Sequence, residues 1–287
     1  MPTIHELVAT ARRELYDAGI PQGEADLDAR LLIERLLGWD AARYFAHGDQ
    51  AAPADLVDRY QQQIARRVCR EPVAYISGVQ EFWGLPIEVT PAVLIPRPET
   101  ELIVDIALEL APDAGAALQM ADVCTGSGCL AVALAVERPA AAIIATDISP
   151  DALAVAARNL ARHQVSDRVR LVRTDLLEGV DGPFDFIVAN PPYVPDGDEF
   201  LLQPEVVQRE PHLALFAASD GLSAIRPLVV QAVSRLRMGG YLVFEFGYGQ
   251  SESIAAVIAR TEGLSLVDIR NDLQGIPRTA ITRRSEA

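Results

Sequence analysis

From residue 98 to its end, the chain alternates between apolar runs of strand length and amphipathic runs of helix length. Strands are predicted at residues 118–123, 141–147, 168–174, 184–189, 240–247, 264–270 and 276–283. Helices are predicted at residues 99–110, 129–138, 150–163, 221–237 and 251–260. A helix between two strands returns the chain to the same end of a sheet, so most of these strands must pair in parallel. The last two strands have no helix between them and predict an antiparallel edge hairpin. We therefore expect an α/β fold with a mostly parallel seven-stranded sheet.

Residues 1–72 have a different pattern, without strand signals. Leucines at helical spacing predict a helix over residues 24–37, and a second amphipathic helix follows over residues 55–68. Residues 73–97 change character again and suggest a short hairpin that links two domains. The expected organisation is a small helical domain over residues 1–72, a hairpin linker over 73–97, and the α/β domain over 98–287.

The composition narrows the class of protein and its partners. No apolar stretch among the 287 residues approaches membrane-spanning length, and no signal-peptide core precedes the first helix, so a cytoplasmic protein without a membrane partner is expected. The net charge of −15 disfavours direct binding of nucleic acid, which requires a basic surface. All 25 basic residues are arginine, and without lysine neither a Walker phosphate loop nor a pyridoxal Schiff base can form.

The potential metal ligands and thiols are scattered along the chain. Cys69, Cys124 and Cys129 form no Cys-x-x-Cys pair, and the four histidines lie far apart in the sequence. Free thiols and the absence of a metal site are therefore predicted.

A glycine-rich loop follows the first strand of the α/β domain. Cys124, Thr125, Gly126, Ser127 and Gly128 join that strand to its helix. Glycines let the backbone approach a ligand closely, and the start of a helix presents free N–H groups. The spacing also fits the dinucleotide fingerprint, so the loop alone does not distinguish a nicotinamide dinucleotide from S-adenosylmethionine.

Acidic residues end the next two strands. Asp147 follows the second strand, where a carboxylate can accept hydrogen bonds from both hydroxyls of a ribose. Ser149 can cap the following helix, which leaves Asp147 available for a ligand. Asp175, with Leu176 beside it, follows the third strand, where it is expected to face the adenine of the same nucleoside. A helix cap or a solvated loop is the competing interpretation for each aspartate.

The fourth strand ends in Asn190, Pro191, Pro192 and Tyr193. Proline fixes its own φ and donates no hydrogen bond, so the pair predicts a rigid loop at the sheet edge. That loop carries an amide, exposed carbonyls and one aromatic ring, which suit a flat, uncharged nitrogen group. It offers no hydride-handling or acid–base pair, so it favours S-adenosylmethionine as the cofactor.

These two loops together resemble the class I methyltransferases, which have a Rossmann-like fold and act on planar nitrogen. Adenine-DNA, ribosomal-RNA and protein-glutamine methyltransferases share them. The resemblance narrows to the release-factor glutamine methyltransferases (the HemK/PrmC family) through the segments Phe-Trp-Gly-Leu at 82–85, Leu-Ile-Pro-Arg-Pro-Glu-Thr-Glu at 94–101, Glu-Pro-His-Leu-Ala-Leu-Phe at 210–216 and Asp-Gly-Leu at 220–222.

The resemblance implies a reaction and a set of site residues. The family methylates the side-chain amide nitrogen of the glutamine in the Gly-Gly-Gln loop of class 1 peptide chain release factors. It implies that the 124–128 loop, Asp147 and Asn190 bind the cofactor, that Thr100 lies beside it, and that residues 190–193 grip the glutamine. Asn190, Pro191 and Tyr193 would then be the catalytic residues. Cys124, Cys129 and Leu176 depart from the family pattern.

Two other functions compete with this interpretation. A nucleic-acid methyltransferase would use the same four-residue loop on an exocyclic amino group of a flipped base, but it would need a basic docking face. A binding module without catalytic activity is disfavoured because both loops are intact. Residues 1–72 contain none of the cofactor motif, and we expect them to dock the substrate.

Overall fold

The computed structural model describes residues 1–286, which divide into two compact units. The helical unit comprises Met1–Val79 together with Pro204–Arg209, and the sheet unit comprises Gln80–Gln203 and the chain from Glu210 onward. A segment distant in sequence therefore belongs to the helical unit.

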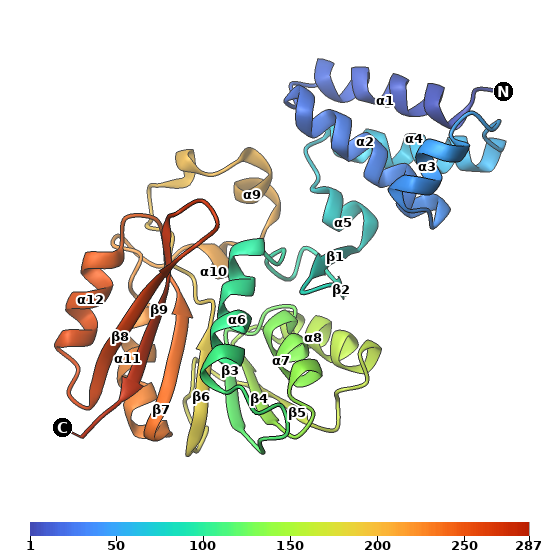
Figure 1. Ribbon diagram of the computed structural model, residues 1–287. Helices are drawn as coiled ribbons and strands as arrows, with labels where there is room; N and C mark the ends of the chain where they lie inside the picture. The colour runs from blue at the N-terminus through green and yellow to red at the C-terminus, as the bar shows by residue number, and fades with distance from the viewer. Residues whose placement is uncertain (287) are drawn as a thin grey trace. The chain divides into compact units, whose positions relative to one another are not determined.

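The helical unit consists of short amphipathic helices around one apolar core (Figure 1). The first begins at a capping box, in which Thr3 and Glu6 each bind the other's backbone N–H. The second ends at Gly38, whose φ of 62° is the left-handed conformation that glycine adopts without strain. The helices are α1 (Ile4–Asp17), α2 (Gln22–Leu37), α3 (Ala41–His47), α4 (Ala54–Val68), α5 (Val73–Ser77) and α9 (Pro204–Arg209).

Helix α9 is joined to the rest of the helical unit by buried ion pairs. Arg67 is only 4% exposed, and its guanidinium donates to Asp28 at 2.7 Å and to Glu205 of α9 at 2.9 Å. Arg70 donates to the same oxygen of Glu205 at 3.1 Å. A buried charge is costly unless it is paired, so removing either partner is strongly destabilising. These pairs explain why a segment more than a hundred residues away packs with the N-terminal helices.

The predicted hairpin linker is partly wrong. Residues 73–77 form the short helix α5 between Pro72 and Gly78, where we expected the hairpin to begin. Proline before the first turn and a left-handed glycine after the last are helix boundaries, and they outweigh the β-branched residues between them. The hairpin itself is β1 (Val79–Phe82) and β2 (Leu85–Glu88), turning at Trp83 and Gly84.

The sheet unit contains the predicted seven-stranded sheet, within the described residues. Its order is β5-β4-β3-β6-β7-β9-β8, with the first five strands parallel and β9 antiparallel to both of its neighbours. The mostly parallel sheet with an antiparallel edge hairpin is thus confirmed. The strands are β3 (Gln119–Val123), β4 (Ala142–Asp147), β5 (Val169–Arg173), β6 (Phe184–Ala189), β7 (Leu236–Glu245), β8 (Leu264–Asn271) and β9 (Pro277–Arg284).

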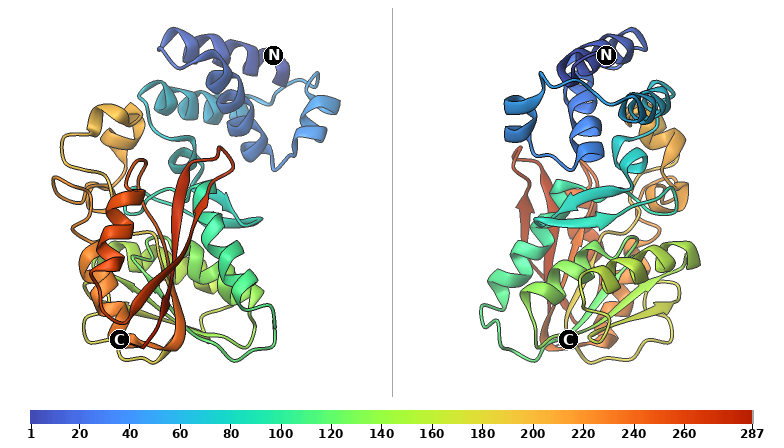
Figure 2. Two further views of the ribbon diagram at one scale, coloured as in Figure 1. Left: turned by 60° about the vertical axis from the view of Figure 1, so that its left-hand side comes forward. Right: turned by 90° about the vertical axis from the view of Figure 1, so that its right-hand side faces the viewer.

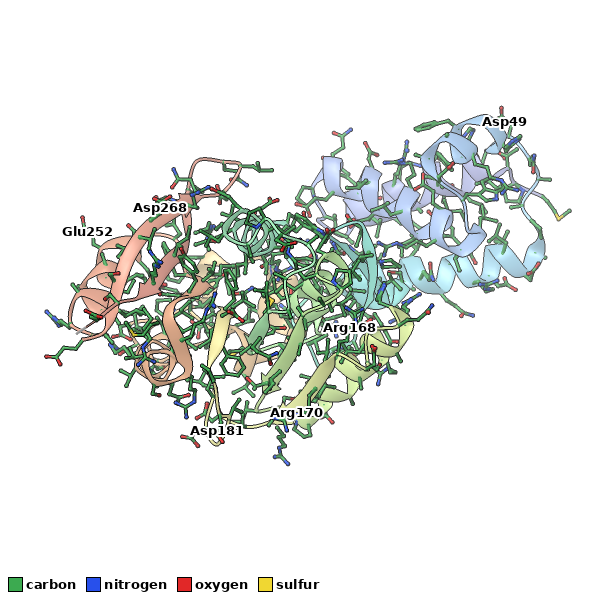
Figure 3. All side chains as sticks on the ribbon, turned by 60° about the horizontal axis from the view of Figure 1, so that its bottom comes forward. Asp49, Arg168, Arg170, Asp181, Glu252 and Asp268 are labelled. Carbon is green, nitrogen blue, oxygen red and sulfur yellow. The ribbon has the colours of Figure 1, made fainter. Side chains whose placement is uncertain are left out.

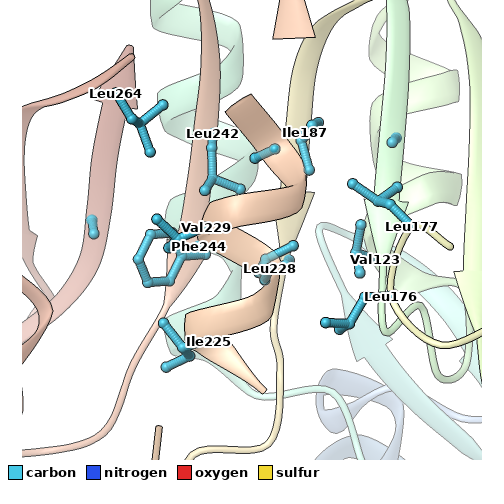
Figure 4. Close-up of a cluster of buried hydrophobic side chains, with 14 of the residues drawn as sticks. Val123, Leu176, Leu177, Ile187, Ile225, Leu228, Val229, Leu242, Phe244 and Leu264 are labelled. Atoms are coloured by element: carbon cyan, nitrogen blue, oxygen red, sulfur yellow. The ribbon is translucent and has the colours of Figure 1, made fainter. Parts of the chain in front are cut away.

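Helices cover both faces of this sheet (Figure 2). One face carries α6 (Glu101–Leu110), α7 (Cys129–Glu137) and α8 (Pro150–Arg162), and the other carries α11 (Ile225–Arg235) and α12 (Ser251–Ala259). On the second face, Ile225, Leu228 and Val229 of α11 pack against alternate residues of β7, Leu242 and Phe244 (Figure 4). Side chains alternate along a strand, so Glu245 must point to the α6 face.

Strand β7 begins earlier than the sequence predicts, at Leu236 in place of residue 240. Its pairing with β6 is irregular between Phe184 and Phe186, and Gly239 has a φ of 79°. The irregularity breaks the alternation of side chains along the strand, so the sequence pattern did not predict the first residues of β7. Beyond it the register is regular, with Ala189 of β6 opposite Phe244 of β7. Asn190 and Glu245 therefore leave the two strands side by side.

Within residues 1–286, no helix has both the length and the apolar character needed to cross a bilayer.

Candidate active site

A cavity of about 370 Å³ lies at the carboxyl ends of the parallel strands. This is the edge of an open α/β sheet where ligands bind. Its lining brings together most of the residues predicted for the site: Thr100, Cys124, Thr125, Gly126, Ser127, Asp147, Asp175, Leu176, Asn190 and Pro192.

Three predicted site residues do not line this cavity: Gly128, Pro191 and Tyr193. Gly128 begins α7 with a φ of 80°, and a Cβ there would lie 3.1 Å from the Cβ of Ala156. Close packing of α7 on α8 is therefore sufficient reason for glycine at this position. Both belong to the loop Asn190 to Tyr193 that follows β6, which we call the acceptor loop; Pro191 is buried and Tyr193 is partly buried.

Two segments complete the wall and were not predicted as site residues. They contribute Ala92 to Leu94 with Pro96 on one side, and Pro211, Leu213, Ala214 and Phe216 on the other. Buried Glu210 joins them, since its carboxylate accepts hydrogen bonds from the Ile95 N–H at 3.0 Å and from the Arg97 guanidinium. Leu94, Pro96 and the whole second segment lie within stretches that carry the family resemblance, and that was the available signal; Ala92 and Val93 precede those stretches.

Asp122 supports the glycine-rich loop from beneath. Its Oδ2 accepts hydrogen bonds from the Thr125 hydroxyl at 2.5 Å and from the Ala131 N–H at 3.1 Å. Its Oδ1 has no partner within the described residues. Complete burial raises the pKa of Asp122 to about 7, against the opposing effect of these two hydrogen bonds. The carboxyl thus fixes the loop but is costly to ionise.

This shift predicts a pH dependence of stability. The folded-state pKa of Asp122 lies above its ordinary value of 3.8, so the folded chain holds this proton more tightly than the unfolded chain. The stabilisation is present at low pH and is lost as the pH rises toward about 7. Asp122→Asn cannot titrate. Its free energy of unfolding, relative to wild type, should increase by ~3 kcal/mol between about pH 5 and about pH 8.

Denaturant unfolding of the two cofactor-free proteins at both pH values measures this difference. An offset that does not change with pH would contradict the assignment of the raised pKa to Asp122.

Asp147, the last residue of β4, connects this strand to the glycine-rich loop. Its Oδ2 accepts the Gly126 N–H at 2.9 Å and its Oδ1 accepts the Ser149 N–H at 2.9 Å. The Ser149 side chain caps α8, as predicted. Burial raises the pKa of Asp147, and the N–H donors partly oppose that rise. Each carboxylate oxygen still has a lone pair available for a further donor.

The lining of the cavity is acidic. Asp147 and Asp175 lie in it, and none of the lining residues of the described chain is basic. A Cβ placed on Gly126 would meet nothing within 4 Å, so the glycine leaves open space in the cavity wall. A cationic sulfonium ligand fits such a lining, whereas the two phosphates of a nicotinamide dinucleotide would be repelled by it. The cavity therefore supports S-adenosylmethionine over the dinucleotide.

A buried chain of hydrogen bonds holds the acceptor loop. Asn190 Nδ2 donates to Thr100 Oγ1 at 3.0 Å, and Thr100 Oγ1 donates to Glu245 Oε2 at 2.6 Å. The Tyr193 hydroxyl donates to Glu245 Oε1 at 2.8 Å. Burial raises the pKa of Glu245, while these hydroxyls and Arg278 favour its ionised form. Glu245 was not predicted, although a single carboxylate ending an apolar strand was a visible signal.

The backbone of Tyr193 is also fixed. Its carbonyl accepts a hydrogen bond from Gln250 Nε2 at 2.9 Å. Gly221 approaches the same carbonyl so closely that a Cβ there would lie 2.3 Å from it. The glycine of the Asp-Gly-Leu segment is thus required for close approach to the acceptor loop.

Thiol and metal chemistry have no support in this site. Burial raises the pKa of Cys124 above its ordinary range and that of Cys129 to about 12, so neither is a thiolate. Within residues 1–286, no cluster of histidine, cysteine and acidic side chains could hold a metal ion.

Comparison with sequence families places both parts of the chain. Residues 6–78 match a family described as the PrmC N-terminal domain, and residues 103–210 match the methyltransferase small domain. The release factor glutamine methyltransferase of Bradyrhizobium diazoefficiens is 41% identical over 265 residues, covering 91% of this chain and 89% of its own. That of Koribacter versatilis is 38% identical over 284 residues, covering 98% and 99%.

Solved structures agree on the fold. The ribosomal protein L11 methylase of Lactobacillus delbrueckii subsp. bulgaricus superposes with a TM-score of 0.50 at 25% identity, covering 66% of this chain and 81% of its own. The 16S rRNA N2 G1207 methyltransferase of T. thermophilus, solved with AdoMet and guanosine, gives 0.51 at 16% identity, covering 73% and 50%. These likenesses confirm the class I methyltransferase fold.

Proposed function

Because this chain belongs to the release factor glutamine methyltransferase family, we propose that it methylates a glutamine of class 1 peptide chain release factors, with S-adenosylmethionine as the donor. The acceptor is the side-chain amide nitrogen of the glutamine in their Gly-Gly-Gln loop. One observation carries the proposal: an amide acceptor loop, Asn190 to Tyr193, stands at the wall of an acidic cavity suited to a sulfonium.

The residues around the cavity fit this donor. Asp147 would hold the ribose, the loop at Thr125 to Ser127 would hold the remainder, and Leu176 would contact the adenine. The cofactor supplies an electrophilic methyl group on a positively charged sulfur. The cavity would partly withdraw this group from water, which would strengthen electrostatic interactions within the site.

Asn190 performs the central task on the acceptor side. An amide nitrogen is a poor nucleophile because its lone pair is delocalised into the carbonyl. Asn190 Oδ1 and the Pro191 carbonyl accept the two N–H hydrogens and orient that nitrogen toward the cavity. The same oxygens stabilise positive charge that develops on nitrogen in the transition state. Tyr193 holds the amide plane.

The proton is lost after transfer. The nitrogen that has accepted the methyl group still carries both hydrogens and a positive charge. This cationic amide is strongly acidic, so water accepts one proton without a dedicated base. We assign no side chain of the site to this step.

The acceptor is a protein, and direct binding of nucleic acid plays no part. The net charge of −15 and a cavity without basic lining both oppose phosphate. We propose a cytoplasmic location, because the proposed substrate is a translation factor.

We further propose that the helical unit docks the release factor. The cavity is lined entirely by residues of the sheet unit, so the helical unit is not needed for the cofactor. A chain that starts at Gln80 should bind S-adenosylhomocysteine with an affinity within ~3-fold of the full chain. Its methylation of release factor should fall by ~10-fold or more, because remote binding energy positions the acceptor. Titration calorimetry and initial rates measure the two effects; full activity of the shortened chain would contradict docking.

The proposed reaction is tested by offering labelled S-adenosylmethionine with release factor, tRNA, ribosomal RNA and DNA in parallel. Label should enter release factor only. Label in nucleic acid alone would favour the competing base methyltransferase. Calorimetry with S-adenosylhomocysteine and NAD provides a separate check, since only the first should bind.

A further inference from the structure

The side chain of Glu245 is buried beside the acceptor loop and contacts two residues of the site. It is 1% exposed at the end of β7, next to Asn190 at the end of β6. Each of its oxygens receives one hydroxyl, from Thr100 and from Tyr193. A buried carboxylate is expensive, and an apolar residue of similar size is often no less stable. Stability therefore does not account for a glutamate at this position.

The hydrogen-bond directions in this cluster are determined by the carboxylate. Both carboxylate oxygens of Glu245 accept a hydrogen bond, Oε2 from the Thr100 hydroxyl and Oε1 from the Tyr193 hydroxyl. The Thr100 hydroxyl has one hydrogen, which that bond uses. Thr100 can then only accept from Asn190, and the partner atom must be the amide Nδ2.

The orientation of Nδ2 toward Thr100 determines where the oxygen of the Asn190 amide points. With Nδ2 facing Thr100, Oδ1 is the free end, and it makes no hydrogen bond within residues 1–286. A flipped amide would present N–H donors to the glutamine N–H groups, which would repel them. The Glu245 carboxylate, acting through Thr100, thus decides whether Asn190 presents an acceptor or a donor to the glutamine.

We propose that Glu245 is a positioning residue for methyl transfer, which fixes the Asn190 amide through Thr100 and the acceptor-loop ring through the Tyr193 hydroxyl. It does not line the cavity, and it acts through Thr100 and Tyr193. The inference rests on the proposed methylation of glutamine and adds the group that orients its acceptor.

Replacing Glu245 with leucine removes both acceptors and keeps the site filled. The Thr100 hydroxyl is then free to donate to Asn190, which turns the amide around. We expect kcat for release factor to fall by ~10- to 100-fold, the loss typical of one charged hydrogen-bonding partner. The KM for release factor and the affinity for S-adenosylhomocysteine should change by less than ~3-fold. A kcat within ~3-fold of wild type would overturn the proposal.

The threonine provides a second test that does not depend on Glu245→Leu being folded. Thr100→Ser keeps the hydroxyl and should lose less kcat than Thr100→Val, which should lose about as much as Glu245→Leu. Thr282→Val is the matched control: Thr282 is fully buried in β9 and its hydroxyl donates to the Leu242 carbonyl, away from the cavity. Equal losses of kcat in the two valine variants would show a merely structural role.

A double-mutant cycle on kcat tests whether Glu245 and Asn190 are coupled, which a loss of packing alone would not produce. The Asn190→Asp side chain accepts hydrogen bonds through either oxygen, so the direction in which it points does not matter. When Glu245 is present, however, the Thr100 hydroxyl already donates to Glu245 and cannot donate to this carboxylate. Asn190→Asp should therefore be less harmful when combined with Glu245→Leu than when introduced alone. Multiplicative effects on kcat would contradict the proposed coupling. If wild type itself methylates no release factor, the proposed function fails; if it does and these variants match it, only the positioning role fails.

Discussion

Asn190→Ala is expected to lower turnover of release factor by ~10²- to 10³-fold, the usual consequence of losing one preorganised polar partner in a transition state. The side chain contributes mainly while positive charge develops on the glutamine nitrogen. The KM for release factor should change far less, because one amide is a small part of a protein–protein interface. Initial rates over a range of release factor concentrations separate kcat from KM.

A matched control for this variant is Asn271→Ala, at the end of the edge strand β8. It removes an exposed asparagine of the same sheet and should leave turnover unchanged. If Asn190→Ala raised KM and left kcat intact, Asn190 would bind the substrate without acting in the chemical step.

Asp147→Ala should weaken binding of S-adenosylhomocysteine by ~1.5–3 kcal/mol, which is ~10- to 150-fold in Kd. Two losses combine in this variant. The ribose loses its charged acceptor, and the Gly126 N–H loses the partner that holds the glycine-rich loop at 2.9 Å. Titration calorimetry measures the affinity, and thermal unfolding confirms that the variant is folded.

Asp181→Ala serves as the control for that measurement. Asp181 projects from the loop before β6, at the opposite end of the strand from Asn190 (Figure 3). Its removal should not affect the cofactor. Equal affinities of wild type and Asp147→Ala would exclude Asp147 from the ribose site.

The sequence predicted the features that arise from local pattern and strand direction. Alternating apolar runs gave the seven strands, and parallel pairing brought their carboxyl ends to one edge. Residues distant in sequence, such as Gly126, Asp147 and Asn190, could therefore be placed at one cavity before any contact was known. These three positions do line it.

The features that were missed depend on pairings between distant residues. Helix α9 joins the helical unit through Glu205 and Arg67, which are 138 residues apart. Glu245 acts on Thr100 across 145 residues. The sequence around each glutamate does not indicate which distant residue it contacts, so the role of neither glutamate could be predicted from local pattern. The error in where the hairpin begins has a local cause. Pro72 and Gly78 bound a short helix, but the β-branched residues between them favoured a strand prediction.

The most direct test of the central claim is to locate the methyl group. Release factor is incubated with the enzyme and S-adenosylmethionine, and its peptides are sequenced by tandem mass spectrometry. A single methyl group is expected on the side-chain nitrogen of the glutamine in the Gly-Gly-Gln loop, and none should enter a release factor in which that glutamine is replaced. Methyl groups that persist in the replaced factor, or that appear only on nucleic acid, would contradict the assignment.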